Sequence, residues 1–487
     1  MSLQGLVARP GRAPSGGHFA PTRIMVVDIE TSMPSIDPSS AATGTPYETV
    51  EVLVRLHARP LGVLTFDLRV GPISASQLEM LIQHRWGDII RRHLRADEER
   101  HSIAGSAMAG DAWDTCPLYV PSPPSVSVVI PTCRRPNDLA RCVDSILATK
   151  YPRLEVIIVD NAPQEPETAD LIADRFSGEP RVRYVREWTS GASRARNLGV
   201  HSARGEIVAF TDDDVVVDQH WLAALTHALV ANPDVDCVTG LVMPAALDTP
   251  VQLWFEQFGG FNRGYEQRVF DLAGKRGDTL LYPYTAGALG GLGNAAFRRS
   301  ALRQPDAFDV TLGPGTPAFS AEDQDAFVYL LQAGGRLLYE PAALVRHRHR
   351  EDYSHLRWQV FTYGAGQTAA LLHWALRDRS VALELLRRVP AVLPLAIGLR
   401  RQGTSPGAAA DACRQELRRL ERLGYIYGPV AYGRALYWRR RIRRLATRQA
   451  AGGLLAGSVE RDKSEGGPLG RPAARDRDVP QSRASAG

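Results

Sequence analysis

The sequence has no apolar stretch near the length of about 20 residues that a helix needs to cross a membrane. The best candidate, residues 389–399, is short and contains two prolines. The first residues also lack the apolar core of a secretory signal. These absences argue against a transmembrane or secreted protein, and we expect a cytoplasmic one.

Cysteine is scarce, and its spacing follows no CxxC or other pattern typical of disulfide frameworks or metal sites. We therefore expect free thiols in a reducing compartment. The five cysteines are Cys116, Cys133, Cys142, Cys237 and Cys413.

Lysine is rare beside arginine, and the net charge of +5 is modest for 487 residues. The basic excess lies mostly after Arg336, without the interleaved aromatics or known modules of nucleic-acid binding. We therefore expect no nucleic-acid partner. A hydrophobic fraction of 44% with 23% charged residues is typical of a globular protein, here long enough for two or three domains.

Composition and periodicity divide the chain into parts, with a Pro/Ser-rich linker at residues 121–125. In the part at residues 23–120 we expect no catalytic chemistry, and we assign this part a recognition or docking role. The predicted parts are a disordered N-terminus (1–22), a small α/β accessory domain (23–120), a large α/β domain (125–350), a helical region (351–448) and a disordered tail (449–487).

In the large domain, short β-branched runs alternate with amphipathic stretches of helical period. This alternation predicts a mostly parallel sheet that binds ligands at the carboxyl ends of its strands. Asp160 and residues 212–214 follow predicted strands and should lie at that edge. The predicted strands are 126–131, 154–159, 181–185 and 206–211, and the predicted helices are 137–150, 165–176 and 193–202.

Residues 211–214 read Thr-Asp-Asp-Asp at the end of a strand. Three adjacent carboxylates repel one another unless a cation or solvent compensates them. Hard oxygen ligands suit Mg²⁺ or Mn²⁺, which suggests a metal–diphosphate site. A solvated acidic turn is the alternative. Asp218 is predicted as the N-cap of the next helix.

Six motifs then occur in order, and together they resemble a family 2 (GT-A fold) glycosyltransferase over about residues 125–350. The resemblance implies a Rossmann-like core and an inverting, metal-dependent transfer of sugar from a UDP- or dTDP-linked donor to an acceptor hydroxyl. The motifs are VSVVIPTCRRP (126–136), VIIVDN (156–161), GASRARNLG (191–199), TDDD (211–214), GNAAFR (293–298) and AEDQD (321–325).

By resemblance, the nucleotide sugar is bound where the first strands end. Asp160 could instead be a turn former, and Arg194 is a weaker candidate whose alternative is a solvated helix face. The residues expected at the nucleotide sugar are Pro131, Thr132, Asp160, Arg196, Asn197, Asp212 and Asp213.

The resemblance assigns Asp214 and His347 to the metal. Imidazole with carboxylate suits Mn²⁺ better than Mg²⁺, although either ion is allowed. His349 has the same parity on the predicted strand and stays an alternative ligand. A surface histidine among arginines 346, 348 and 350, which could also contact a diphosphate or an anionic acceptor, is the other reading.

In this family an acidic pair opening a helix supplies the general base. Asp323 is expected to take the proton from the acceptor hydroxyl, with Glu322 orienting the acceptor or the base. Asp325 is a second candidate for the base. First-turn acids favoured by the helix dipole are the alternative interpretation.

Residues 287–297 are glycine-rich but do not open a βαβ unit, so we reject a dinucleotide fingerprint and expect them to line the sugar and acceptor side of the cleft. Core packing is the favoured role of the aromatic residues before them, ahead of stacking on a sugar or lipid. These are Trp254, Phe255, Phe258 and Phe261.

Helices are predicted at 352–375, 411–423 and 432–447, the last two rich in arginine. They suit an anionic membrane surface, such as the inner face of the cell membrane, or solvated packing on the core. The acceptor can then be a carbohydrate, a lipid-linked sugar or a small molecule.

Two other functions compete with sugar transfer. A sugar-phosphate nucleotidyltransferase would need a glycine-rich first loop with a lysine, which is missing after Ile130. A non-catalytic nucleotide-sugar-binding scaffold would not need the intact acids at 212–214 and 322–323.

Overall fold

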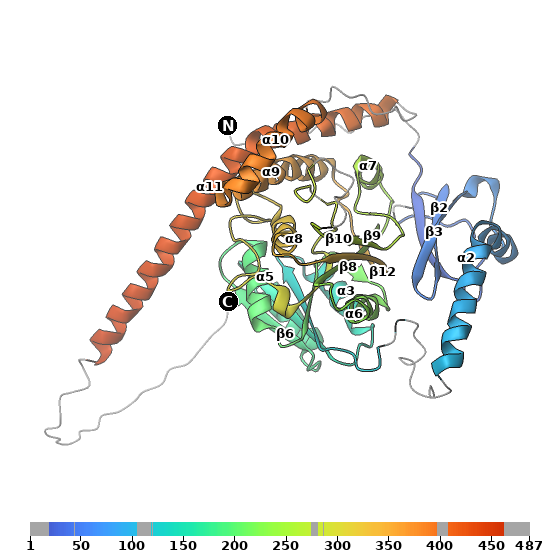
Figure 1. Ribbon diagram of the computed structural model, residues 1–487, viewed down its shortest axis with the longest axis horizontal. Helices are drawn as coiled ribbons and strands as arrows, with labels where there is room; N and C mark the ends of the chain where they lie inside the picture. The colour runs from blue at the N-terminus through green and yellow to red at the C-terminus, as the bar shows by residue number, and fades with distance from the viewer. Residues whose placement is uncertain are drawn as a thin grey trace, which may run out of the picture. The chain divides into compact units, whose positions relative to one another are not determined.

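The computed structural model describes residues 19–42, 44–104, 118, 120–273, 281–285, 287–396 and 408–461 (Figure 1). The predicted disorder before residue 19 and after residue 461 lies outside these residues. The chain forms two compact units, Met1–Leu436 and Tyr437–Gly487, and each is described by itself. Among the described helices, none combines the length and apolarity required to cross a membrane. The four described cysteines are free thiols, as predicted, and Cys116 is not described.

The N-terminal part is a three-stranded sheet covered by one long helix. Strand β2 pairs in parallel with β1 and antiparallel with β3. The elements are β1 (Thr22–Asp28), β2 (Thr49–Leu56), β3 (Arg59–Asp67), a 3₁₀ turn η1 (Leu68–Val70) and α2 (Ala75–Ala104).

Strand β2 is buried on both faces. Its neighbouring side chains point in opposite directions, and they meet α2 on one side and the large domain on the other. Val52 packs toward α2, whose buried residues Leu78, Ile82, Trp86 and Ile90 recur every four positions. Leu53 packs with Leu241 and Leu344 of the large domain. Arg55 adds ion pairs to Asp28 (2.7 Å) and to Asp218 of the large domain (2.8 Å). The accessory domain is therefore docked on the core.

The large domain is built on a nine-stranded sheet with the order β10-β12-β9-β11-β7-β4-β5-β6, to which β8 is added beside β12. Six strands run in one direction, and β8, β10 and β11 run against them. The strands are β4 (Val126–Thr132), β5 (Leu154–Asn161), β6 (Val182–Glu187), β7 (Ile207–Thr211), β8 (Val215–Val217), β9 (Cys237–Pro244), β10 (Arg268–Phe270), β11 (Asn294–Arg298) and β12 (Leu337–His347).

Helices cover both faces of this sheet. Val128 and Ile130 of β4 pack with α3 and α6, whereas Val129 between them packs with α5 and α8. Strand β4 is therefore buried on both sides, as expected for a strand of a mostly parallel sheet. The helices are α3 (Pro136–Leu147), α4 (Glu167–Phe176), α5 (Ala192–Ser202), α6 (Trp221–Ala231), α7 (Pro250–Phe258) and α8 (Glu322–Gln332), with a 3₁₀ turn η2 at Arg299–Ala301.

The predicted N-cap of α6 is wrong. His220 occupies the cap position and makes no side-chain capping bond. Asp218 lies two residues earlier, where its carboxylate accepts from the His220 N–H (3.0 Å) and from Arg55 (2.8 Å). This acid is used to join the accessory domain to the core, which no local signal could reveal.

The C-terminal region is helical, but the two helices predicted at 411–423 and 432–447 form one continuous helix. The helices are α9 (Tyr353–Arg377), α10 (Arg379–Ala396) and α11 (Ala408–Arg461). Helix α11 continues through Pro429, which has no N–H to donate to the Tyr425 carbonyl. The Thr368 hydroxyl of α9 donates to that carbonyl instead (2.9 Å).

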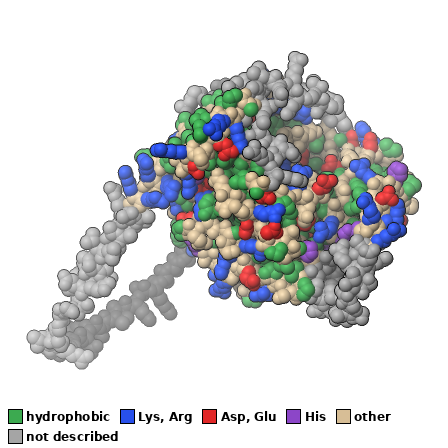
Figure 2. Space-filling model, viewed as in Figure 1, with side chains coloured by type: hydrophobic (Ala, Val, Ile, Leu, Met, Phe, Trp, Pro, Cys, Tyr) green, Lys and Arg blue, Asp and Glu red, His purple; other side chains and the backbone are tan. Residues whose placement is uncertain are grey.

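Helix α11 also extends beyond residue 449, where a disordered tail was predicted to begin. On the face shown in Figure 2, basic side chains gather along the described part of this helix, and all of those that belong to α11 are arginines. The basic character predicted for this region is therefore displayed at the surface of the helix.

Candidate active site

The residues predicted to bind the nucleotide sugar meet at one edge of the sheet. Thr132 at the end of β4 lies opposite Asp160 at the end of β5, and the acid triplet follows β7, which pairs with β4 on its other side. This edge is the carboxyl end of parallel strands, where open α/β sheets bind ligands.

The three acids of the triplet point to different partners. Asp213 is buried and accepts hydrogen bonds from the Thr132 hydroxyl (2.8 Å) and from Arg135 (3.1 Å). Burial raises the pKa of Asp213 to about 6. Because its oxygens bind protein groups, this side chain ties β4 to β7, and we place it in the scaffold of the site.

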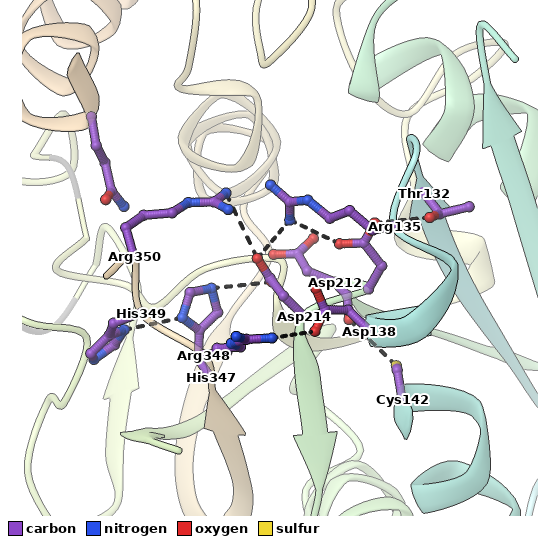
Figure 3. A network of polar contacts seen from close by, with 12 residues as sticks. Thr132, Arg135, Asp138, Cys142, Asp212, Asp214, His347, Arg348, His349 and Arg350 are labelled. Atoms are coloured by element: carbon purple, nitrogen blue, oxygen red, sulfur yellow. Dashed lines mark hydrogen bonds and ion pairs between the residues drawn. The ribbon is translucent and has the colours of Figure 1, made fainter. Parts of the chain in front are cut away.

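Asp214 is surrounded by positive groups. One carboxylate oxygen lies 2.7 Å from Arg135 and 3.8 Å from Arg350, and the other lies 3.3 Å from His347 Nε2 (Figure 3). Burial alone would raise the pKa of Asp214, but His347 and Arg135 outweigh it and hold the pKa well below its usual range. Asp214 therefore stays ionised.

His347 and His349, both left open as metal ligands by the sequence, take different places. His347 at the end of β12 faces Asp214, as Figure 3 shows. His349 lies behind it, bonded to Glu256 (2.5 Å) and not to the triplet. The structure therefore favours His347.

Arg196 connects the two halves of the site. This buried guanidinium donates to Asp212 (2.9 Å) and to Glu322 at the start of α8 (2.7 Å). Burial would lower the pKa of Arg196, but Glu322 and Asp212 outweigh it and raise the pKa. Charge-assisted bonds on both sides of Arg196 fix the separation of Asp212 and Glu322.

Among the described residues, no cationic side chain is bonded directly to Asp323. One oxygen accepts from the Gln324 N–H (2.7 Å), and the half-buried side chain lies against Gly291, where a Cβ would come within 3.4 Å of the other oxygen. Burial and then the neighbouring Glu322 raise the pKa of Asp323 to about 7. A carboxylate with such a pKa can accept a proton near neutral pH.

The glycine-rich stretch lies beside both groups of acids. At Gly293 an added Cβ would come within 2.9 Å of an Asp212 oxygen, so a side chain would displace that acid. Gly291 lies in the same way beside Asp323, so both glycines border the acids of the candidate site.

Asp325, the second candidate for the base, is engaged elsewhere. Its buried carboxylate accepts from Arg303 (2.9 Å) and Trp374 Nε1 (2.9 Å) and lies 3.4 Å from His373. Burial opposes these contacts, which nevertheless lower its pKa to about 2. Asp325 fixes α8 to α9 and is not placed to act as the base.

Two other predicted nucleotide residues are held by protein partners. Asn197 is bonded through both ends of its amide to the Phe308 backbone, at 2.8 and 2.9 Å. Its geometry is that of a structural clamp, so we do not place it at the nucleotide. Asp160 accepts from the Tyr184 hydroxyl (2.7 Å), and burial raises its pKa. Pro131 remains at the end of β4, half-buried.

The predicted aromatic packing is present, with an addition. Trp254, Phe255, Phe258 and Phe261 form a cluster with residues of α9 and α11. Phe261 also lies edge-on to the His347 ring, 5.1 Å between centroids.

Arg135 and Arg350 are site residues to which the sequence reasoning assigned no defined role. Both contact Asp214. Arg135 stands within the first motif, just after the end of β4, and that position at the ligand-binding edge was the available signal. Arg350 belongs to the arginines after β12 that were assigned only a general affinity for anions.

The donor set fits a divalent cation. Within the described residues, no group of three or more His, Cys, Asp or Glu side chains is arranged so that it could hold a metal ion. Asp214 and His347 nevertheless present a carboxylate and an imidazole 3.3 Å apart, and Asp212 lies on the same short turn. Mixed oxygen and nitrogen donors of this kind suit Mn²⁺.

Comparison with known proteins agrees with this geometry. The family described as Glycosyl transferase family 2 matches residues 127–304. Over 245 residues the chain is 26% identical to a glucosyl-dolichyl phosphate glucuronosyltransferase of Haloferax volcanii, covering 48% of this chain and 73% of the relative. Over 243 residues it is 29% identical to a pre-mycofactocin glycosyltransferase of Mycobacterium tuberculosis, covering 47% of this chain and 45% of the relative.

Among solved structures, a mannosyltransferase of Pyrobaculum calidifontis in complex with GDP-Man and Mn²⁺ aligns with 79% of this chain and 91% of its own. The TM-score is 0.40 and the sequence identity 18%.

A mostly parallel sheet with acids at its carboxyl edge is the arrangement of α/β domains that bind ligands at that edge. Residues 127–304 match glycosyltransferase family 2, as the six motifs predict, and the domain around them is α/β with a mostly parallel sheet. This match favours a glycosyltransferase over the nucleotidyltransferase and the non-catalytic scaffold.

Proposed function

We propose that this enzyme transfers a sugar from a nucleotide diphosphate donor to an acceptor hydroxyl, with inversion at the anomeric carbon and with a divalent cation. The observation that carries the proposal is the link from Asp212 through Arg196 to Glu322, which joins the donor acids to the start of α8 by bonds of 2.9 and 2.7 Å. Asp323, the neighbour of Glu322, carries the raised pKa of a base.

On the acceptor side, Asp323 takes the proton from the acceptor hydroxyl while the hydroxyl oxygen attacks the anomeric carbon of the donor sugar. A single displacement of this kind inverts the configuration, because attack and departure occur on opposite faces of the sugar. Glu322 is bonded to Arg196 and orients Asp323 without sharing the proton.

On the donor side, Thr132, Asp160 and Asp212 surround the place where the first strands end, and we assign them to the nucleotide. Asp214 and His347 would hold the cation, and Arg135 and Arg350 supply positive charge beside it. When bound, Mn²⁺ or Mg²⁺ neutralises charge on the diphosphate as the sugar leaves. A UDP- or dTDP-linked sugar is the proposed donor.

The test is release of nucleoside diphosphate from a panel of UDP-, dTDP- and GDP-linked sugars, with Mn²⁺, with Mg²⁺ and with EDTA. Release that requires the metal and depends on one nucleobase of the donor supports the proposal. Full activity in EDTA would contradict the proposed dependence on a metal. A preference for a GDP-sugar would contradict the proposed UDP- or dTDP-linked donor. The anomeric configuration of the product, determined by NMR, decides between inversion and retention.

We further propose that the enzyme works at the cytoplasmic surface of an anionic membrane, where a lipid-linked acceptor is available. In the first unit, Leu423, Ile426 and Val430 of α11 are 53%, 76% and 55% exposed at helical spacing, with Arg419 and Arg434 also exposed. In the second unit, the same helix carries five arginines between residues 439 and 444. Exposed apolar residues beside arginines suit a lipid interface. The archaeal relative is named for a dolichyl-phosphate-linked sugar.

A further inference from the structure

Behind the proposed metal ligand, His347, lies a line of side chains that leads away from Asp214. Glu256 at the end of α7 bonds His349 Nε2 at 2.5 Å, and His349 Nδ1 lies 3.2 Å from His347 Nδ1. His347 Nε2 in turn lies 3.3 Å from Asp214 (Figure 3). Four groups from three segments are thus connected in sequence.

The chemistry of these groups determines where the protons lie. An ionised carboxylate only accepts, so His349 donates from Nε2 to Glu256. Neutral His349 then has its lone pair on Nδ1, to which His347 donates from its own Nδ1. Without a metal, His347 Nε2 shares a proton with Asp214. Once that proton leaves, neutral His347 has its lone pair on Nε2, the atom that faces Asp214. A lone pair and a carboxylate oxygen 3.3 Å apart favour a cation at that place.

The surroundings hold this arrangement. His349 is 4% exposed, and its ring lies against Phe255 and Phe261 at centroid distances of 4.7 and 5.9 Å. Room for the Glu256 carboxylate exists because Gly260 has no side chain, since a Cβ there would lie 2.5 Å from the carboxylate oxygen. Gly260 also has a φ of +42°, which favours glycine.

We propose that Glu256 and His349 are positioning residues that hold His347 in its Nδ1-protonated form and present Nε2 beside Asp214 to a divalent cation. This inference rests on the metal site of the proposed function. Partners behind a ligating histidine fix its tautomer and ring orientation, and their loss typically weakens metal affinity 10- to 100-fold.

The experiment measures Mn²⁺ affinity by electron paramagnetic resonance, without donor or acceptor. His349→Phe keeps a ring between Phe255 and Phe261 but removes both bonds, and it should raise the Mn²⁺ Kd about 10- to 100-fold. Glu256→Gln introduces an amide that can also donate, allowing the reversed proton order, and should raise the Kd about tenfold. His355→Phe, at a side chain 72% exposed, is the matched control and should leave the Kd unchanged.

Thermal melting establishes that each variant is folded. The tautomer is read separately, from ¹⁵N shifts of His347 in the neutral state of the wild-type protein labelled at histidine. Protonation of Nδ1 is expected, and a proton on Nε2 alone would overturn the inference whether or not the variants fold.

The outcomes separate the two proposals. If Mn²⁺ binds the wild type and both variants with the same Kd, the positioning role is overturned and the metal site stands. If the wild type binds no Mn²⁺, the metal site and the positioning role fail together.

Discussion

Asp214 and Asp323 are both withdrawn from bulk solvent, yet their pKa values move in opposite directions. Asp214 has His347, Arg135 and Arg350 within 4 Å, and its pKa falls well below the usual range. Asp323 has Glu322 beside it and no direct cation, and its pKa rises to about 7. The same chemical group becomes a permanent anion on the donor side and a proton acceptor on the acceptor side, because the number of nearby cations differs.

Asp323 and Asp325 share the first turn of α8, yet their pKa values also move in opposite directions. Two positions separate them, so they point to different sides of the helix. Asp325 meets Arg303, Trp374 and His373, and its pKa is about 2. The tertiary partner, rather than the helix position, decides which of the two acids can be a base.

The largest effect is expected from Asp214→Asn. A neutral amide is a poor ligand where charge must be neutralised, so turnover should fall below detection while the melting temperature shows a folded protein. Asp306→Asn, at a side chain 55% exposed, is the control and should retain full activity. An Asp214→Asn enzyme as active as the wild type would remove Asp214 from the metal site.

Asp323→Asn should lower kcat by about 100-fold or more, the usual scale for loss of a general base. The donor Kd, measured by calorimetry, should stay nearly constant because Asp323 lies on the acceptor side. A collapse of donor affinity instead would place Asp323 in the nucleotide site and make Glu322 the candidate base.

Asp325→Asn should act on stability. It leaves the largely buried Arg303 without its charged partner, a loss of about 3–5 kcal/mol in the free energy of unfolding when a buried pair is broken. Denaturant unfolding measures this loss. At temperatures where the variant stays folded, kcat should remain within a few-fold of the wild type. A kcat reduced as far as in Asp323→Asn would make Asp325 a catalytic residue after all.

Membrane attachment is tested on the full chain by co-sedimentation with anionic vesicles. Removing the charges of Arg440 and Arg441 by Gln substitution should weaken binding roughly thirtyfold, at about 1 kcal/mol for each basic residue. Substituting Arg141 and Arg153, which are 52% and 54% exposed on the catalytic domain, is the matched control. High salt or neutral lipid should have the same effect as losing the charges. Equal binding of both double variants would leave α11 as an ordinary packing element.

The pH dependence should show the base directly. Asp323 accepts a proton only when it is ionised, so kcat/KM should fall about tenfold for each pH unit below a pKa of about 7. Above pH 7 the same group should impose no further increase. In the Asp323→Asn enzyme the residual rate should lose this acidic limb. A limb of unchanged position in that variant would assign the titration to another group.

The sequence alone determined the class of this protein and most of its elements. Strands β4, β5 and β7 were predicted from apolar runs followed by polar residues, because parallel strands buried on both faces read as continuous apolar runs. The six motifs identified the family, which the match over residues 127–304 supports.

The partners of each acid were decided only in three dimensions. Asp213 and Asp214 are adjacent in the chain, yet one binds Thr132 and the other faces His347, more than a hundred residues away. Asp218 looked like a helix cap and instead binds Arg55 of the accessory domain.

The same holds for the C-terminal helices and for the histidine pair. Helix α11 passes through Pro429 because Thr368 of another helix donates the bond that proline cannot. Parity along β12 treated His347 and His349 alike, and only Glu256, brought in by α7, separates them. Local pattern reports which face of an element is apolar. The protonation and role of a polar group depend on long-range partners, which the folded chain alone brings together.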